Sequence, residues 1–374
     1  MRILLLNWRD IRNPAAGGAE VVTYEIARRW VQWGHQVTWF TAGFPGGVPE
    51  EEIAGIQIIR RGRQYSVHYQ AFRHYRQSLR GKFDLVIDEV NTIPFFTPLY
   101  VTEPKVAFIH QLAREVWLYE SRFPVNLLGY RLEPCYLRTY RNTPSIVVSE
   151  STWQDLNALG FRKVHVVLDG VGVAPLAEVP SRAEKAGRPT VLYIGRVVPS
   201  KRVTDVVQAV HLLRAQVPQV QLWIVGKGEP DYIAQLQCQA EEYGLARQVR
   251  FWGRVSAAQK LELFRSAHVV ALASVREGWG LVVIEANAVG TPAVVYRVPG
   301  LVDSVQDETT GLVCRENTAQ NMAEQLCRVL LDIELQERLS QQALEWSRQF
   351  TWERNAREFL SVLVKVLGGK AEPH

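Results

Sequence analysis

Short apolar runs rich in β-branched residues alternate with helical segments along almost the whole chain. The clearest helical segments are residues 19–33, 203–215, 257–267 and 281–289. Strands that alternate with helices of about 10–15 residues predict parallel sheets with helices on both faces. We therefore expect an α/β fold, with strands at residues 3–6, 37–40, 85–87, 106–109, 146–148, 164–168, 190–194, 221–225, 249–251, 269–272 and 293–296.

The alternation breaks once, between residues 170 and 189, where three prolines and three glycines occur without a clear period. Such a stretch is typical of a linker, and 374 residues are enough for two domains. We predict Rossmann-like, doubly wound domains over residues 1–170 and 190–350, joined by a linker over 171–189 and facing each other across a ligand cleft. Residues 351–374 are predicted to form a final helix, which either completes the second domain or crosses back to the first.

Composition narrows the class of protein. Apolar content of 47% and charged content of 22% are ordinary for a globular chain, and no apolar run reaches the about 18 residues of a membrane-spanning helix. The apolar run at the start is too short for a secretory signal. The four cysteines are scattered, with no histidine cluster beside them, so we expect a cytoplasmic protein with reduced thiols and no metal site.

The net charge of +5 is concentrated in the first half, since residues 1–170 carry +4 of it. Either an anionic surface partner or a mildly basic solvated face accounts for this excess, and we expect no nucleic-acid partner. Residues 115–141 mix aromatic and leucine side chains with four arginines. This composition fits contact with an anionic membrane, at its inner face, or with a lipid-linked acceptor; the alternative is a helix packed on its own domain.

Two features of the first half are candidates for ligand binding. Gly17 and Gly18 lie in a loop that follows the first strand and opens a helix, where paired glycines let a phosphate approach backbone N–H groups. The loop is not the G-x-G-x-x-G dinucleotide fingerprint. His110 ends the strand at 106–109 and so lies at the carboxyl edge of the sheet, although a lone histidine often has a structural role.

The second half begins with two cations in unusual places. Arg196 follows the strand at 190–194, and Lys201 precedes the next helix. Cations at the start of a helix oppose its macrodipole and are unfavourable for stability. A bound diphosphate would remove that penalty; the alternative is a solvated pair of cations.

Glycine turns follow the next two strands at the same edge of the predicted sheet. These turns are Gly226-Lys227-Gly228 and Gly253-Arg254-Val255. They could let backbone atoms contact a nucleobase, although each alone is also compatible with an ordinary strand-to-helix turn.

Residues 277–285, Glu-Gly-Trp-Gly-Leu-Val-Val-Ile-Glu, place two carboxylates eight positions apart. Gly278 and Gly280 let the backbone curl at the start of a helix, so that Glu277 and Glu285 can reach one ligand. Backbone N–H groups exposed at such a turn, between two acceptors, suit a polyhydroxylated ligand that carries negative charge.

Together these motifs resemble the retaining glycosyltransferases of family 4 (glycosyl transferase group 1), which have the GT-B fold of two Rossmann-like domains. The resemblance covers nearly the whole chain, and its most specific part is the pair of glutamates eight residues apart. The matching segments are Gly17-Gly18-Ala19-Glu20, Gly34-His35-Gln36-Val37, Gly195-Arg196 with Lys201, Gly226-Lys227-Gly228, Glu277 through Ala286, Gly290-Thr291-Pro292 and Thr310-Gly311-Leu312-Val313.

The resemblance implies a role for each position. Arg196 and Lys201 would neutralise the donor diphosphate, Glu277 would accept hydrogen bonds from the donor sugar, and His110 would lie beside the reacting sugar. These four are the expected catalytic residues, and Glu285 is expected to hold the ribose hydroxyls. Further donor contacts are expected at Gly17, Gly18, Gly226, Lys227, Val255, Gly278, Trp279, Gly280 and Leu281.

The function that the resemblance implies is a retaining hexosyltransferase without metal or cofactor. Its donor is a nucleotide sugar of the UDP-glucose or GDP-mannose type, and its acceptor is open, a lipid-linked or polysaccharide-precursor molecule being one candidate. The alternatives are an epimerase or a phosphorylase of the same fold, or a non-catalytic partner that binds nucleotide sugars. An epimerase needs acid and base groups at the sugar, and a phosphorylase of the glycogen type needs a pyridoxal-binding lysine; we can place neither. A non-catalytic partner would have lost Arg196, Lys201 or Glu277, and all three are present.

Overall fold

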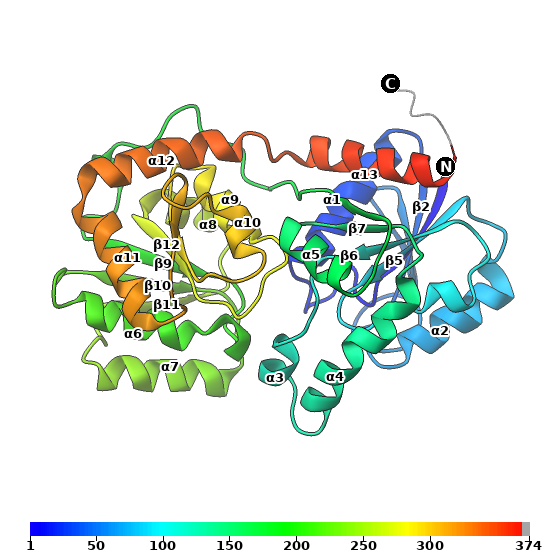
Figure 1. The fold of residues 1–374 in the computed structure, drawn as a ribbon, viewed down its shortest axis with the longest axis horizontal. Helices are drawn as coiled ribbons and strands as arrows, with labels where there is room; N and C mark the ends of the chain where they lie inside the picture. Colours follow the sequence, from blue (N-terminus) through cyan, green and yellow to red (C-terminus); the bar gives the residue numbers. More distant parts are fainter. Residues whose placement is uncertain (369–374) are drawn as a thin grey trace. The chain divides into compact units, whose positions relative to one another are not determined.

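The computed structural model describes residues 1–368, which divide into two compact α/β units (Figure 1). Unit 1 consists of Met1–Arg114, Leu128–Gly170 and the chain from Thr351 onward. Unit 2 consists of Glu115–Leu127 and Val171–Phe350. Each unit is built on one mainly parallel sheet, which confirms the α/β class expected from the alternating pattern.

The sheet of unit 1 has eight strands within the described residues, in the order β3-β4-β2-β1-β5-β6-β7-β8. The central strand β1 is apolar and almost fully buried beyond its first residue. The bounds are β1 Arg2–Leu6, β2 Gln36–Thr41, β3 Glu50–Ile53, β4 Ile56–Arg60, β5 Leu85–Val90, β6 Lys105–Ile109, β7 Ser145–Val147 and β8 Val164–Val166. The helices are α1 Gly18–Gln32, α2 Val67–His74, α4 Val125–Leu137, α5 Glu150–Ala158 and α13 Trp352–Val366, and α2 continues into a π turn at Tyr75–Leu79.

The hairpin of β3 and β4 was not among the expected strands. Its two strands pair antiparallel, at the edge of a sheet that is otherwise parallel. Ala54 and Gly55 connect them with φ values of 51° and 81°, the left-handed conformation that two-residue hairpin turns require. Three consecutive glutamates in β3 have low strand propensity, so pairing with β4, and not local preference, makes this segment a strand.

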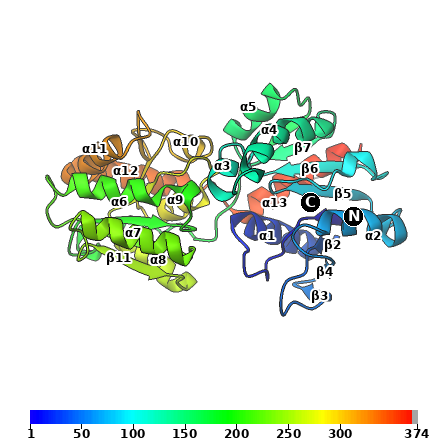
Figure 2. The same ribbon diagram turned by 90° about the horizontal axis from the view of Figure 1, so that it is seen from below.

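The final helix α13 lies beside α1 in both views (Figures 1 and 2). The Trp30 indole N–H donates to the carbonyl of Ala356 at 3.1 Å. Phe359 packs edge-on against Trp30 and Phe108, with ring centroids 5.3 and 4.9 Å apart. Of the two placements open at the start, the helix therefore takes the one in unit 1; residues 369–374 of the predicted helix lie outside the described residues.

The sheet of unit 2 has six parallel strands in the part of the chain that is described, in the order β11-β10-β9-β12-β13-β14. The bounds are β9 Thr190–Ile194, β10 Gln221–Val225, β11 Val249–Gly253, β12 Val269–Leu272, β13 Ala293–Val295 and β14 Gly311–Val313. The helices are α3 Val116–Glu120, α6 Val203–Leu213, α7 Pro230–Glu242, α8 Ala257–Ser266, α9 Leu281–Asn287, α10 Leu301–Ser304, α11 Ala319–Leu331 and α12 Ile333–Ser347. Strand β14 was also missed, because three residues are too few to show a pattern.

Each sheet contains a point where the strand order changes direction. In unit 1 this point lies between β1 and β5, and in unit 2 it lies between β9 and β12. Chain segments leave such neighbouring strands toward opposite sides, which opens a crevice at their carboxyl ends where ligands bind in this class of sheet. We therefore expect ligand-binding residues at the two switch points.

Phe359→Ala should destabilise unit 1 by about 3–5 kcal/mol, because it removes a buried ring that joins α13 to α1 and β6. Chemical denaturation followed by tryptophan fluorescence measures the change. Tyr65, whose ring is 88% exposed, provides the control: Tyr65→Ala should leave the unfolding midpoint of unit 1 almost unchanged. Equal effects of both variants would contradict the packing described for α13.

Candidate functional site

The turns after β9, β10 and β11 are joined to one another by their backbones. Gly195 N–H donates to Val225 O at 3.0 Å, and Gly226 N–H donates to Gly253 O at 2.9 Å. A Cβ on Gly226 would lie 1.7 Å from the carbonyl oxygen of Gly195, so only glycine allows the two turns to approach this closely. The structure thus brings the predicted glycine turns together at one edge of the sheet.

The cation Lys201 and the carboxylate Glu277 meet at the switch point of unit 2. Lys201 ends the 3₁₀ turn Pro199–Lys201 after β9, and its Nζ lies 2.5 Å from Glu277 Oε1. Ser274, just after β12, donates its hydroxyl to the same oxygen at 2.7 Å. Both side chains of the ion pair are largely shielded, with exposures of 15% and 20%. Glu277 is therefore held firmly by one oxygen, and no described residue bonds its Oε2.

The turn that carries Glu277 is shaped by Gly280 and Gly300. Gly280 precedes α9 with φ of 79°, a conformation that side chains rarely adopt. A Cβ on Gly300 would lie 2.3 Å from the carbonyl oxygen of Glu277. Trp279 is 3% exposed and packs edge-on against Phe350, so its ring belongs to the core and only its backbone can face a ligand.

Glu285 lies on α9 and is paired with a lysine that the sequence did not single out. Lys260 Nζ, on α8, lies 2.6 Å from Glu285 Oε2. The partners are 25 positions apart, on two helices that come directly before and directly after β12 in the chain. In the sequence, only its position on the helix after the predicted turn at Gly253 could have marked Lys260 as a site residue.

Arg196 and its neighbours contact a segment from the first half of the sequence. Glu120 lies 3.2 and 3.3 Å from the two terminal nitrogens of Arg196 and accepts a hydrogen bond from Ser200. Glu115 lies 3.0 Å from Nε of Arg276, which is 8% exposed. Sequence reasoning missed both ion pairs, since neither Glu120 with Arg196 nor Glu115 with Arg276 forms a local motif.

The remaining predicted donor residues of unit 2 lie at the same edge. Lys227 is exposed, and its carbonyl accepts the N–H of Val197 at 2.9 Å. Val255 is partly buried against the core, between β11 and α8. Gly278 and Leu281 flank the tight turn at Gly280, and Leu281 begins α9.

In unit 1, Gly17 and Gly18 stand at the start of α1, as the sequence predicts. The Gly17 N–H already donates to the Glu20 carboxylate at 2.6 Å, so this N–H is capped within the start of α1. Glu20 is fully buried and also pairs with Arg9 at 2.9 Å. Gly18 is exposed at the first helical position, which leaves its backbone as the accessible part of the predicted phosphate contact.

His110 follows β6 and forms a buried pair with Glu89, a residue that the sequence did not single out. The distance from His110 Nε2 to Glu89 Oε1 is 2.9 Å, and Thr23 donates to Glu89 Oε2 at 2.6 Å. Burial alone would lower the pKa of His110, but Glu89, with Asp169 and Glu20, raises it above its ordinary value. The carboxylate of Glu89 therefore favours the protonated form of the imidazole.

Asp169 completes this buried group of unit 1. Burial raises the pKa of its carboxyl to about 7, and Glu89 adds to the rise while His110 opposes it. Its Oδ1 is buried without a hydrogen-bond partner among the described residues. The charges of Asp169 and His110 therefore influence each other, although no hydrogen bond joins the two side chains within the described residues.

The structure places the predicted site residues in two groups. Gly17, Gly18 and His110 belong to unit 1, and all the others belong to unit 2. Within unit 2 the residues gather at the carboxyl edge of the sheet, but the roles assigned to them stay predictions.

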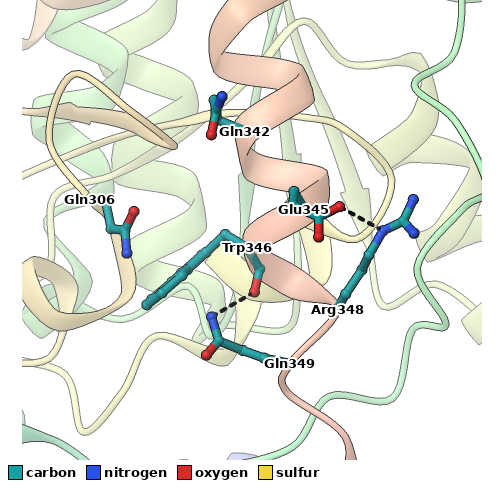
Figure 3. A pocket seen from close by; sticks show the side chains of 6 residues that line it. All are labelled: Gln306, Gln342, Glu345, Trp346, Arg348 and Gln349. Carbon is teal, nitrogen blue, oxygen red and sulfur yellow. Dashed lines mark hydrogen bonds and ion pairs between the residues drawn. The ribbon is translucent and has the colours of Figure 1, made fainter.

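A hollow of about 470 Å³ lies away from both groups, along α12 (Figure 3). An ion pair of Glu345 and Arg348 and the ring of Trp346 form part of its wall. None of the predicted site residues lines it, so side-chain chemistry, and not volume, locates the candidate site.

The described residues contain no group of three histidine, cysteine, aspartate or glutamate side chains that could hold a metal ion. The four cysteines are free thiols. No helix in the described part of the chain is both long and apolar enough to cross a bilayer. A metal-free reaction remains an expectation.

Two family models match the chain. The model described as "Glycosyl transferases group 1" matches residues 177–346, and the model described as "Glycosyltransferase Family 4" matches residues 16–174. The first match contains the candidate site of unit 2, and the second contains Gly17, Gly18 and His110.

Named proteins are similar to part of the chain. A D-inositol 3-phosphate glycosyltransferase of Jonesia denitrificans is 33% identical over 222 residues, which cover 55% of this chain and 52% of that protein. A glycogen synthase of Mycobacterium tuberculosis is 28% identical over 241 residues, which cover 62% of this chain and 57% of that protein. The chain thus spans about half the length of the named relatives that it matches.

Solved structures are similar over nearly the whole chain. A sucrose-phosphate synthase from Thermosynechococcus elongatus has a TM-score of 0.80 at 22% identity, with 98% of this chain and 99% of that chain covered. The Anabaena protein HepE, solved with UDP and glucose, has a TM-score of 0.75 at 18% identity, with 98% and 100% covered. These similarities confirm the fold expected from the sequence.

Asp169→Asn should flatten the pH dependence of stability. In the folded state the pKa of Asp169 is raised from 3.8 to about 7, so folded molecules keep a proton that unfolded molecules release. The stability that this provides is present below about pH 4 and is lost as the pH rises toward 7. Urea denaturation at several pH values should show a smaller fall for the variant. An identical fall in both proteins would mean that Asp169 is ionised throughout this range.

Proposed function

Because the chain belongs to the glycosyltransferases of group 1 and family 4, with the GT-B fold, we propose that it moves a hexose from a nucleotide-sugar donor to an acceptor. The Anabaena neighbour HepE was solved with UDP and also with UDP-glucose. This similarity supports a nucleotide sugar as donor, of the UDP-glucose type or, as the second candidate, of the GDP-mannose type. The proposed acceptor is a lipid-linked or polysaccharide-precursor molecule.

The observation that carries this proposal is the contact of Lys201 with Glu277 at the switch point of unit 2. A cation beside the carboxyl end of β9 suits the donor diphosphate, and a carboxylate beside it suits the hydroxyl groups of the sugar. Ser274 and Lys201 hold the Oε1 atom of Glu277. In our proposal Oε2 accepts a hydrogen bond from a sugar hydroxyl, so Glu277 positions the sugar and does not attack it.

The pair of Glu285 and Lys260 fits the other end of the donor. Lys260 holds Oε2 of Glu285 at 2.6 Å, which fixes the orientation of the carboxylate. We propose that Oε1 then accepts hydrogen bonds from the two ribose hydroxyls. The glycine turns at Gly226 and Gly253 provide backbone atoms for the nucleobase.

The proposed reaction breaks the bond from the anomeric carbon to the diphosphate and forms a bond to the acceptor oxygen on the same face. Arg196, Lys201 and backbone N–H groups offset the negative charge that develops on the leaving diphosphate. The proton of the acceptor passes to the leaving phosphate, so no side-chain base and no metal are needed. His110, paired with Glu89, lies beside the reacting sugar in this proposal.

Lys201→Ala is expected to lower turnover roughly 100- to 1000-fold, because removing one preorganised group that stabilises transition-state charge costs about 3–4 kcal/mol. Release of UDP from UDP-glucose and of GDP from GDP-mannose measures the effect and also selects the donor. The circular dichroism spectrum and the thermal midpoint should show that the variant remains folded.

Lys163→Ala, at an exposed lysine of unit 1, is the matched control and should keep wild-type turnover. Near-normal turnover of Lys201→Ala would contradict the assigned site. Nucleotide binding without any turnover in the wild-type protein, across donors and acceptors, would favour a non-catalytic partner instead.

We also propose that α4 contacts the inner face of an anionic membrane. Leu128 and Leu132 lie one turn apart on α4 and are 54% and 53% exposed, while Glu133 on the opposite face is 1% exposed. On an ordinary surface helix the apolar side chains are buried and the charged ones are exposed. Here the two leucines are exposed and the glutamate is buried. The buried carboxylate is satisfied by the backbone N–H of Ala113, at 2.6 Å. Arginines beside the exposed leucines, Arg131 and Arg138, suit anionic lipid headgroups.

The double substitution of Leu128 and Leu132 by serine should abolish sedimentation with vesicles of anionic lipid, because it removes the apolar contact with the bilayer. Sedimentation with anionic and with neutral vesicles, at low salt, measures binding. Leu331→Ser changes a leucine of unit 2 that is 56% exposed and should not affect binding. If wild-type protein stays in the supernatant with anionic vesicles, the membrane proposal is wrong.

A further inference from the structure

A short segment from the first half of the sequence belongs to unit 2. Residues Glu115–Leu127 cluster with Val171–Phe350, and helix α3 (Val116–Glu120) within this segment packs against the turn Pro199–Lys201 (Figure 1). A glutamate stands at each end of α3. The segment thereby brings two carboxylates to the edge of the sheet where we propose that the donor diphosphate binds.

Glu120 occupies a position that is suited to an anion with two oxygens. Its Oε1 and Oε2 atoms lie 3.2 and 3.3 Å from Nη2 and Nη1 of Arg196. The hydroxyl of Ser200 donates to Oε1 at 2.5 Å. A guanidinium fork that holds a carboxylate in this way can hold two phosphate oxygens by the same geometry. Arg196 and Ser200 therefore form a complete anion position, which the chain fills with its own side chain.

The charges around Glu120 keep it ionised. Burial alone would raise the pKa of its carboxyl, but Arg196, the Ser200 hydroxyl and Lys201 together lower it below its ordinary value. Glu120 is thus an anion at neutral pH and competes with other anions for the same donors. The Arg196 side chain is 55% exposed and the Glu120 side chain 28% exposed, so the arginine remains accessible to an anion from solution while the pair is formed.

Glu115 forms the second anchor of the segment. Its Oε2 lies 3.0 Å from Nε of Arg276, whose side chain is only 9% exposed, whereas the glutamate is 42% exposed. The carboxylate is thus the accessible partner of this pair, and the arginine belongs to the protein interior. Departure of α3 would remove this carboxylate from Arg276.

Helix α3 lies at the surface of unit 2. None of its five residues is buried, so it adds no side chain to the core of unit 2. The indole nitrogen of Trp117 is buried without a hydrogen-bond partner in the described part of the chain. Arg114, directly before the segment, has φ of 35°, in the left-handed region that disfavours residues other than glycine. A segment of this kind opens at a small cost in free energy.

We propose that α3 is a carboxylate plug, in which Glu120 occupies the anion position of Arg196 and Ser200 until the donor diphosphate displaces it. The inference rests on the proposed function, because a nucleotide diphosphate is the displacing anion. A diphosphate carries more negative charge than one carboxylate, so the same donors attract it more strongly. The closed plug lowers the apparent affinity for nucleotide in proportion to the fraction of molecules that are open.

Glu120→Gln tests the plug, because it removes the competing charge and keeps the size of the side chain. Isothermal titration calorimetry of UDP and of GDP should show about three- to tenfold tighter binding of the accepted nucleotide to the variant. Glu337→Gln is the matched control, since it makes the same change of net charge at an exposed position on α12. The control should bind with wild-type affinity.

Hydrogen exchange of the wild-type protein gives a second, independent readout. Displacement of α3 predicts faster exchange of the amides at residues 116–121 when nucleotide is bound. A lid that closes over the nucleotide predicts slower exchange at the same amides, and that result would overturn the plug.

The outcomes separate the plug from the proposed function. If wild-type protein binds nucleotide and Glu120→Gln binds it equally or more weakly, the plug is wrong and the proposed function stands. If neither protein binds UDP or GDP, the anion position does not serve the proposed nucleotides, and both proposals fail. Tighter binding to the variant together with faster exchange in α3 supports both.

Discussion

The close approach of the backbone turns after β9 and β10 is the constraint on which the candidate site of unit 2 depends. With any side chain at Gly226, a Cβ would overlap the carbonyl of Gly195 at 1.7 Å. The same contact sets the path of the chain into the turn at Ser200 and Lys201. From there the carbonyl of Ser200 accepts the N–H of Val275 at 2.9 Å, which ties the loop of Glu277 to the same frame. Backbone geometry therefore positions the charged side chains before any ligand arrives.

Ion pairs join the charged side chains at this edge, and their partners come from two sources. Lys201 with Glu277 and Lys260 with Glu285 are formed within the second half of the sequence. Each of these pairs holds its carboxylate by one oxygen, and in our proposal the other oxygen accepts hydrogen bonds from hydroxyl groups of the donor. The partners of Arg196 and Arg276 come instead from the segment Glu115–Leu127. In our proposals the donor uses the first pairs as they stand and displaces Glu120 from the second.

The charged side chains around His110 in unit 1 differ from those of unit 2 because they are buried. His110, Glu89 and Asp169 are each less than 9% exposed, so removing one charge would leave another without compensation. Glu20 similarly uses both of its oxygens, one for Arg9 and one for the N–H of Gly17. This arrangement fixes the start of α1 and the orientation of the imidazole. In our proposal the buried group of unit 1 controls the protonation of His110, whereas the edge of unit 2 binds an anion reversibly.

Much of this organisation could be read from local patterns. Apolar strand runs and intervening helices predicted two parallel sheets, and the family resemblance that rested on the glutamate pair and the glycine turns is confirmed. Positions such as Arg196 and His110 were assigned to the carboxyl edge because a residue that follows a parallel strand must lie there. The hairpin of β3 and β4 and the short strand β14 were missed. Pairing, and not propensity, makes β3 a strand, and the three residues of β14 are too few to show a pattern.

What the sequence by itself determined is therefore the order of elements and the edge at which the chemistry lies, since both follow from periodicity and from turns within a few residues. Only the tertiary structure decided which charges meet. Glu285 pairs with a lysine 25 positions away, and Glu120 pairs with an arginine 76 positions away. A contact of this kind depends on how helices and loops pack on the sheet. No local pattern encodes that packing, because the partners become neighbours only when the core has formed.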